Sequence, residues 1–448
     1  MQAADLSQLG ALAVYLLVII GIGLWTRNRE TPGEFLIASR SAGVVLTTAS
    51  LSAVIGGLVL GAYPALGFEF GVGAIWIMLG DASALVALGF VAGRIRTLAA
   101  EHDFLTLSDY IFLKFDGRTG YLAATLQFAA FLFLLAAQFI VGGQIVAELA
   151  PIGYSSAVVA MGAFTLAYVL LGGYKAVLRT DIVQFVVIFF VFALLVPWNV
   201  DIGALDLDLD FGSPGPMRSV SFFLSGFALF ISADIWQRVY SARSRHVART
   251  SLFLSATIWV ILGACLVLIG IAASGSAGVT ADEALSFGLF NLLPPELAGI
   301  AMVGLLAALM STIDTEVFLL ASMAIKDFVS RRRPLTPVQM GAAIRVAMVA
   351  VTVPAMAIAI WWPSVLGVLF ILTSLLMALL PAVLVSLFRP LSAGIGFSSM
   401  LLGSLLVAPA FVFKWADEDT APVLVLIASA AVVLSALAGA RSTRPAKN

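Results

Sequence analysis

The sequence predicts an all-α polytopic membrane protein with about thirteen transmembrane helices. Hydrophobic residues make up 61% of its 448 positions and charged residues only 11%. Soluble domains carry roughly 25% charged residues, so water cannot be the solvent for most of this surface. Apolar runs of about 20 residues, the length that crosses a bilayer, repeat from one end of the chain to the other. We therefore expect one membrane domain.

Each predicted span corresponds to one apolar run bounded by polar or charged residues. Two of the runs are longer than a bilayer requires, which tilt or a break in the helix can explain. The segment FLTLSDYIFLKF (104–115) is too short and too charged to span. It is predicted as an amphipathic helix on the inner face, with an ordered loop as the alternative. The predicted spans are residues 9–25, 42–66, 71–93, 119–149, 154–171, 181–199, 218–238, 250–274, 299–325, 337–361, 364–388, 393–413 and 421–440.

The distribution of charge predicts the orientation of these spans. With the N-terminus outside, all 24 Lys and Arg residues except Arg218 and Lys414 fall in the inner segments. The outer segments carry acids instead, including Asp282 and Glu283. Such an excess of basic residues in short loops marks the cytoplasmic side. We expect a multi-pass protein of a cell membrane, a bacterial inner membrane, with the C-terminus in the cytoplasm.

Composition and motifs argue against several classes of function. Net charge is −1, without the basic patch that a nucleic-acid partner requires. His102 and His246 fall in polar loops and Cys265 is the single cysteine, so no zinc site is expected. No phosphate-binding loop or nucleophile elbow is present, which argues against an enzyme and against an organic cofactor. No obligate protein partner is indicated; the expected partners are a small solute and the lipid bilayer.

Two glycines at the middle of the span 42–66 are the first candidate site. Adjacent glycines such as Gly56 and Gly57 allow a helix to unwind inside the bilayer, and the unwound carbonyl groups can coordinate a cation. The alternative is close packing of helices through small residues.

Polar residues in the span 299–325 are the second candidate site. Ala308, Ser311 and Thr312 share one helix face, where two hydroxyl groups and a carbonyl form the oxygen surface that a small cation needs. Asp314 and Glu316 follow within about one turn. Two acids inside a span are hard to explain as packing. The alternative is that the span enters the cytoplasm early and both acids are solvated.

Other buried polar residues have simpler explanations beside a functional one. Glutamines such as Gln138 commonly form hydrogen bonds between helices. Asp234 lies four residues before Arg238 and can form a local ion pair with it. Asp181 opens a span and suits the N-terminal end of a helix dipole. The residues in question are Asp81, Gln127, Gln138, Gln144, Asp181, Ser232 and Asp234.

Four stretches resemble the sodium:solute symporter family, which includes sodium–glucose and sodium–proline carriers. Their order and spacing along the chain carry the resemblance. They are EFLIASRSAG (34–43), FLTLSDYIFLKF followed by Gly117 and Arg118, GGYKAVLRTDIVQ (172–184), and the pair DIWQRVYSARS (234–244) with MSTIDTEVFLLASMAIKDF (310–328).

The resemblance implies the inverted-repeat fold of the bacterial leucine transporter, with a discontinuous first helix in each of two five-helix repeats. The repeats would cover residues 42–199 and 218–388 of a core at 42–388, and Gly226 would interrupt the second discontinuous helix. Residues 1–41 would form a peripheral first helix with its inner loop. Residues 389–448 would form two peripheral helices and a short cytoplasmic tail.

The resemblance also implies a sodium site. The carbonyl groups of Ala53, Gly56 and Ala308 and the hydroxyl groups of Ser311 and Thr312 match the family's ligand positions. Asp181 matches an acid near the inner exit route of the cation. Two departures stand out: Ile55–Gly57 replaces a polar Asn-Ile-Ser, and Glu316 is unusual at its position. Glu316 could replace sodium coupling with proton coupling.

These observations predict a symporter that couples inward sodium movement to uptake of an amino acid, a monocarboxylate or a similar small solute. Alternatives are a proton-coupled carrier, a transporter-like sensor module, or a channel or uniporter with the same fold. The solute is expected near Ser52, Gly57, Gln138, Ser232 and Trp236. The acids expected to take part in coupling or exit are Asp181, Asp234, Asp314 and Glu316.

Overall fold

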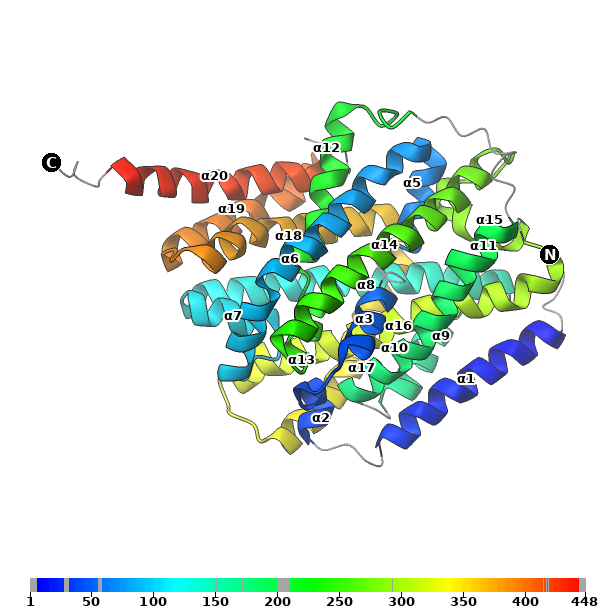
Figure 1. Ribbon diagram of the computed structural model, residues 1–448, viewed down its shortest axis with the longest axis horizontal. Coiled ribbons are helices and arrows are strands. Elements are labelled where there is room, and N and C mark those ends of the chain that lie inside the picture. Colours follow the sequence, from blue (N-terminus) through cyan, green and yellow to red (C-terminus); the bar gives the residue numbers. More distant parts are fainter. Residues whose placement is uncertain are drawn as a thin grey trace.

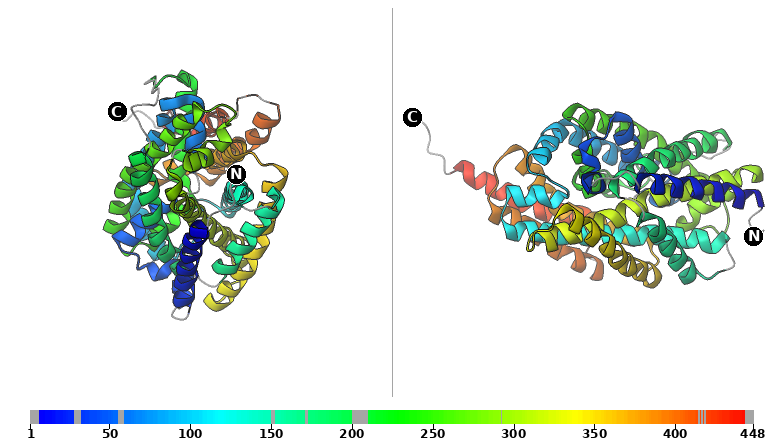
Figure 2. Two further views of the ribbon diagram at one scale, coloured as in Figure 1. Left: turned by 90° about the vertical axis from the view of Figure 1, so that its right-hand side faces the viewer. Right: turned by 90° about the horizontal axis from the view of Figure 1, so that it is seen from below.

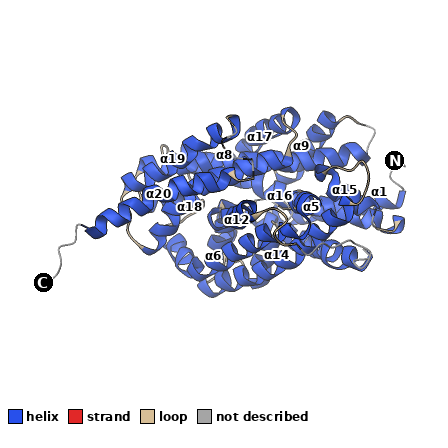
Figure 3. Ribbon diagram, turned by 90° about the horizontal axis from the view of Figure 1, so that it is seen from above, coloured by secondary structure: helices blue, strands red, loops and turns tan. Residues whose placement is uncertain are grey.

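A computed structural model of the protein describes residues 6–27, 32–54, 59–149, 152–170, 173–199, 210–291, 293–413, 415, 417 and 419–442. Figure 3 shows helices throughout this part of the chain. Nine of its helical segments are long and apolar enough to cross a membrane, and a bent pair of helices brings the number to ten. The predicted all-α membrane class is confirmed. The count of thirteen spans is not, although every predicted range overlaps a helix.

The helices of the first half of the chain pack into one bundle. Helix α7 confirms the predicted short helix, but its side chains from Leu107 to Ile111 are buried against the bundle rather than spread on a surface. The elements are α1 (Leu6–Arg27), α2 (Pro32–Ile37), η1 (Ala38–Arg40), α3 (Val44–Ala53), α5 (Ala62–Phe70), η2 (Gly71–Ala74), α6 (Ile75–Glu101), α7 (Leu107–Lys114), α8 (Gly117–Leu149), α9 (Tyr154–Val169), α10 (Tyr174–Ile188), η3 (Phe189–Leu195) and α11 (Val196–Asn199).

The second half of the chain completes the bundle. Figures 1 and 2 show α1 along one edge and α19 with α20 along another, while α8 and α16 run through the middle. The elements are α12 (Pro216–Ser225), η5 (Gly226–Ile231), α13 (Ala233–Ser241), α14 (Arg245–Ser274), η6 (Ala281–Glu283), α15 (Ala284–Asn291), η7 (Pro295–Leu297), α16 (Ala298–Met323), η8 (Ala324–Ser330), α17 (Pro337–Trp361), α18 (Val365–Phe388), α19 (Ala393–Val412) and α20 (Ala421–Ser442).

Two helical segments are interrupted, as the sequence predicts. Helix α3 ends at Ala53 and α5 begins at Ala62; residues 55–58, which include Gly56 and Gly57, lie outside the described part. In the second case Gly226 begins a 3-10 segment, and the axis bends by 43° between Pro216–Ile231 and Ala233–Ser241. Ser232, at the bend, has an extended conformation (ψ 122°).

Helices α5 and α6 form a hairpin. The hydroxyl group of Tyr63 donates a hydrogen bond to the carboxylate of Asp81, which lies 18 residues further along the chain. In one continuous helix these residues would be about 27 Å apart. The chain reverses instead at Gly71, whose φ of 54° suits a residue without a side chain.

Helix α14 lies against both arms of this hairpin through glycines. A Cβ atom at Gly270 would collide with the carbonyl group of Pro64, and one at Gly67 with the carbonyl group of Val267. Small residues of this kind let the backbones of membrane helices approach closely. The hairpin therefore depends on the absence of side chains at these positions.

Replacing Gly270 by Ala should weaken the packing of α14 against α5. We expect a loss of about 1–3 kcal/mol in stability, because the new methyl group meets backbone that cannot rotate away. Gly275→Ala, directly after the end of α14, is the control, since a Cβ atom there meets nothing within 4 Å. Thermal denaturation followed by size-exclusion chromatography measures the difference. Equal midpoints for the two variants would contradict this account.

Candidate functional site

The end of α3 and the middle of α16 meet through oxygen atoms. The hydroxyl group of Ser311 lies 3.0 Å from the carbonyl oxygen of Ala53 and 2.9 Å from that of Ala308. Thr312 Oγ1 lies 3.4 Å from the same Ala308 oxygen. All four residues are at most 1% exposed. Four of the five predicted cation ligands are thus close together, and Gly56 lies outside the described residues.

The position of Ala53 explains why its carbonyl group is available. The last carbonyl groups of a helix have no donor within the helix. Ala53 ends α3, and the donor it meets comes from α16, 258 residues away in the chain. Carbonyl and hydroxyl oxygens are hard ligands, which suit alkali and alkaline-earth cations. Within the described residues, no three His, Cys, Asp or Glu side chains cluster as a transition metal would need.

A buried arginine lies about one turn from this oxygen cluster. Arg238 is 0% exposed. Its Nε donates to Ser50 Oγ at 2.8 Å, and its Nη2 donates to Thr315 Oγ1 at 3.1 Å. Ser50 and Thr315 each lie about one helical turn from a member of the cluster, Ala53 and Ser311. Sequence analysis counted Arg238 among the basic residues of the inner segments and did not predict that its side chain is buried inside the bundle.

Arg238 also forms ion pairs with two acids. Its Nη2 lies 3.4 Å from Asp181 Oδ2, and its Nη1 lies 3.8 Å from Asp234 Oδ2. Ser50 donates a short hydrogen bond to the same oxygen of Asp181. The local ion pair proposed for Asp234 is confirmed. Asp181 is fully buried and pairs with a residue of another helix. It lies in the middle of α10, which begins at Tyr174, so the prediction that Asp181 opens a helix and complements its dipole is wrong.

The two acids of α16 are both inside the protein. Asp314 is 1% exposed and Glu316 0%. Neither oxygen of Glu316 has a hydrogen-bond partner among the described residues. The alternative that both acids are simply solvated is therefore wrong.

The residues predicted to contact solute point in several directions. Ser52 Oγ bonds to Ser255 Oγ at 3.3 Å, and Ser232 donates to Asp234. The indole nitrogen of Trp236 donates to the carbonyl oxygen of Phe230 at 2.8 Å. Gln138 is buried on α8. Gly57 lies outside the described residues, so a common solute pocket formed by these residues stays a prediction.

Contacts across the bundle close the end that carries α7. Arg40 donates to the carbonyl oxygens of Tyr240 at 3.2 Å and Phe104 at 3.0 Å. Ala42 forms a β-bridge with Ala242. These contacts join the segment before α3 to the end of α13. Sequence reasoning missed them because they link residues between 64 and 200 positions apart.

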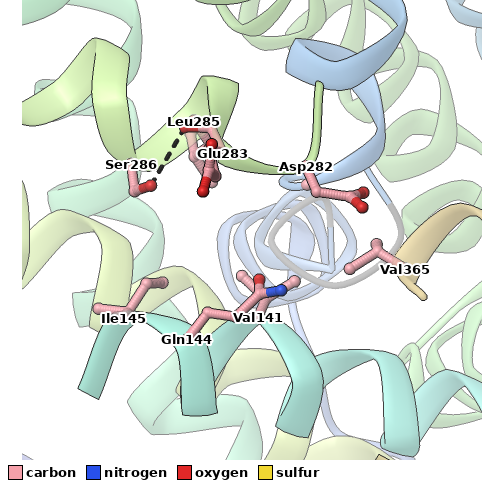
Figure 4. Close-up of a pocket in the computed structure, with 9 residues that line it drawn as sticks. Val141, Gln144, Ile145, Asp282, Glu283, Leu285, Ser286 and Val365 are labelled. Atoms are coloured by element: carbon pink, nitrogen blue, oxygen red, sulfur yellow. Dashed lines mark hydrogen bonds between the residues drawn. The ribbon is translucent and has the colours of Figure 1, made fainter. Parts of the chain in front are cut away.

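The opposite end, which carries α15, holds a small cavity. Figure 4 shows Asp282, Glu283 and Ser286 on one side and Gln144 on α8 on the other. Its volume is about 100 Å³, well below the roughly 300–1,000 Å³ of typical ligand pockets. We interpret it as an entrance to the bundle rather than as a solute site.

Comparison with known proteins shows which family the chain resembles. The sequence model of the sodium:solute symporter family matches residues 35–206. A sodium/pantothenate symporter of Haemophilus influenzae is 26% identical over 357 residues, 72% of each chain. A sodium/proline symporter of Staphylococcus aureus is 25% identical over 351 residues, 71% of this chain and 67% of the relative. The resemblance stated above is confirmed, and these relatives are transporters rather than enzymes.

Solved structures support the same fold. A substrate-bound, outward-open Na⁺-coupled sialic acid symporter superposes with a TM-score of 0.78 over 97% of this chain and 98% of that chain, at 15% identity. Mhp1, a nucleobase-cation-symport-1 family transporter, gives a TM-score of 0.57 over 92% and 95%, at 16% identity. The leucine-transporter fold predicted from the resemblance is confirmed.

The Arg238–Asp181 pair should be essential for stability. Asp181→Asn leaves the guanidinium group partly uncompensated, and removing one partner of a buried pair costs roughly 3–5 kcal/mol. The variant Asp181→Asn/Arg238→Gln should lose less than the sum of its single variants, by about 0.5–3 kcal/mol.

The exposed pair of Arg218 with Asp419, 2.8 Å apart, is the control. Arg218 is 40% exposed, so its loss should cost at most about 1 kcal/mol. Thermal unfolding in detergent compares the two pairs. Additive losses at Arg238 and Asp181 would show that the two side chains are not coupled.

Proposed function

We propose that this protein is a secondary symporter that couples inward movement of sodium to uptake of a small organic solute. The observation that carries the proposal is the meeting of Ala53, Ala308, Ser311 and Thr312, which brings carbonyl and hydroxyl oxygens of α3 and α16 together inside the bundle. The family, whose matched relatives are named as sodium symporters, supports sodium as the coupling ion. Gly56 is the proposed fifth ligand.

Alternating access would link the cation to the solute. A cation bound between α3 and α16 favours whichever state brings the two helices together, by its differential affinity for the two states. A solute bound beside the interrupted helices would favour the same state, and the two ligands would then strengthen each other's binding reciprocally. Asp181, Asp234, Asp314 and Glu316 are proposed to take part in coupling or in release of the cation.

The predicted organisation and orientation are part of the proposal. The core would comprise residues 42–388, with repeats at 42–199 and 218–388, and residues 1–41 and 389–448 would be peripheral. The α7 end would face the cytoplasm and the α15 end the outside. The charge distribution supports this orientation, since the segments at the α7 end are rich in arginine.

A sensor module and a channel remain competing functions with the same fold. A sensor would bind sodium and solute without net transport. A channel would let its substrate flow down its own gradient and would not need a gradient of a second species. The amino acid or monocarboxylate class predicted from the sequence rests on the absence of a multiply charged binding surface. Solute accumulation against its gradient in sodium-free proteoliposomes that are diluted into sodium buffer separates the three functions.

Ser311→Ala combined with Thr312→Ala should remove sodium binding. Sodium is expected to stabilise the parent protein by about 1.4 kcal/mol at ten times its Kd, because it binds the folded state alone. The double variant should lose this shift. Its midpoint in choline should fall, because the carbonyl group of Ala53 loses its donor, so the sodium shift is measured against that lower midpoint. Ser322→Ala, a buried serine on the same helix, is the control and should keep the shift. An undiminished shift in the double variant would rule out the site.

A topology test examines the proposed orientation. A fluorescent protein fused after Asn448 should fold and fluoresce in the cytoplasm, whereas alkaline phosphatase at the same place should be inactive. The reverse pair of results would show that the C-terminus lies outside and would invert the assignment of the two ends.

A further inference from the structure

We propose that the solute is uncharged or cationic, presents N–H or O–H groups, and is not a carboxylate, which departs from the amino acid or monocarboxylate class predicted from the sequence. This inference rests on the proposed function, because it names the charge class of the solute that such a symporter accepts. Three features of the bundle lead to it: an excess of buried acids, a buried arginine whose donors are engaged, and a buried amide oxygen beside the bend at Ser232.

Acids outnumber bases in the interior of the described bundle. Each acid in question is at most 6% exposed, and Arg238 is the base that lies among them. Residues 55–58, which are not described, read Ile-Gly-Gly-Leu and add no charge. Charges act strongly over distance in a medium of low dielectric constant, and an acid supplies no positive charge whether ionised or protonated. The acids are Asp81, Asp181, Asp234, Asp314 and Glu316.

Arg238 is not available to bind a carboxylate. A guanidinium group has five N–H donors. In Arg238, Nε donates to Ser50, Nη2 to Thr315 and Asp181, and Nη1 to the backbone carbonyl of Asp234 at 3.2 Å. Four of the five donors are thus engaged, and Nη1 also lies 3.8 Å from Asp234 Oδ2. An anionic solute would therefore compete with the buried carboxylate groups of Asp181 and Asp234 for Arg238. Asp181 would then lose its counter-charge in a fully buried position, which is strongly destabilising.

The other positive groups are too weak or too distant. Arg96 donates to the carbonyl oxygen of Ala242 and Arg40 to that of Tyr240, both at the α7 end. Asp234 lies in the first turn of α13, where its carboxylate group offsets the positive end of the helix dipole. The N-terminus of α5 contributes only roughly half a unit charge. This partial charge does not offset the five acids.

A hydrogen-bond acceptor lies beside the bend. The Nε2 atom of Gln127 on α8 donates to the carbonyl oxygen of Ile231 at 3.1 Å. The Oε1 atom of Gln127 has no hydrogen-bond partner, although the residue is 0% exposed. A buried polar atom without a partner costs free energy. An N–H or O–H group of a solute at the bend would satisfy it, whereas a carboxylate oxygen would repel it.

This chain would therefore differ from its named relatives. Pantothenate, proline and sialic acid, which appear in the relatives' names, each carry a carboxylate group. The relatives resemble this chain in fold and sequence, but the interior charge is set by individual side chains. Glu316 on α16 and Asp234 on α13 are two such side chains.

Matched pairs of compounds test the charge class. The purified full-length protein is heated in sodium with proline or prolinamide, pantothenate or pantothenol, and sialic acid or its methyl ester. Where a pair of compounds shifts the midpoint of thermal unfolding, the uncharged or cationic compound should give the same shift at a concentration about tenfold lower than the carboxylate. The same scoring applies to a wider set of amines, polyols, amides and carboxylates. Stronger stabilisation by a carboxylate than by its matched partner would overturn the proposal.

The site variants use the stabilising compound found in this way. Gln127→Leu should abolish its shift, while Gln184→Leu, a buried glutamine that contacts Tyr15 instead, should retain it. Equal loss in both variants, or retention in both, would contradict the role given to Gln127. Sodium without any solute is measured in parallel. If sodium does not shift the midpoint while the solute still does, the proposed cation site is contradicted and the solute inference is not.

Discussion

A helix that is interrupted inside a bilayer exposes backbone carbonyl groups that no water can satisfy, and in this protein side chains of other helices satisfy them. At the end of α3, Ser311 donates to Ala53 and Trp259 donates to the carbonyl oxygen of Leu51 at 3.2 Å. At the bend before α13, Gln127 donates to Ile231. Unsatisfied groups in hydrocarbon cost several kcal/mol each. The broken helices can exist only because α8, α14 and α16 cross them at these points.

The same constraint explains why functional chemistry concentrates at the breaks. A carbonyl group that accepts a hydrogen bond from a neighbouring side chain can also accept a cation or a solute donor in its place. Such an exchange is not available within an intact helix, where the backbone partners are fixed. The interruption thus leaves backbone carbonyl groups that can act as ligands. A cation or solute bound there would replace a contact made by a neighbouring helix.

Sequence reasoning recovered the features that depend on composition and periodicity. It predicted the apolar spans, the short helix α7, the interrupted segments and the shared face of Ala308, Ser311 and Thr312, since 3.6-residue periodicity fixes which residues share a face. It failed for Arg238, because a basic residue at the end of an apolar run is usually cytoplasmic. The partners of this guanidinium group come from α3, α10 and α16. No local sequence pattern predicts that these three helices meet α13 at this point.

The expected solute contacts show a second limit of sequence reasoning. Ser52, Ser232 and Trp236 flank the interruptions, where the backbone leaves helical geometry. Periodicity says nothing about side-chain direction once φ and ψ depart from helical values, as they do at Ser232. Each of these side chains instead satisfies a nearby polar group. The bond of Ser52 links two helices, and those of Ser232 and Trp236 depend on the bend in the chain, so their orientation becomes visible only when the folded arrangement is known.

The hydroxyl group of Ser311 links these points to the proposed coupling. A hydroxyl group has one proton to donate and two lone pairs to accept with. When it donates to Ala53, its proton lies between the two oxygens, at the place where a cation shared by both would have to sit. Binding a cation there requires the proton to turn away, so that a lone pair of Ser311 and the Ala53 carbonyl face the ion together. The junction of α3 with α16 then exchanges one hydrogen bond for several ion–oxygen contacts. Because Arg238 contacts both helices about one turn away, through Ser50 and Thr315, a change in the strength of that junction would be transmitted to α13 and α10.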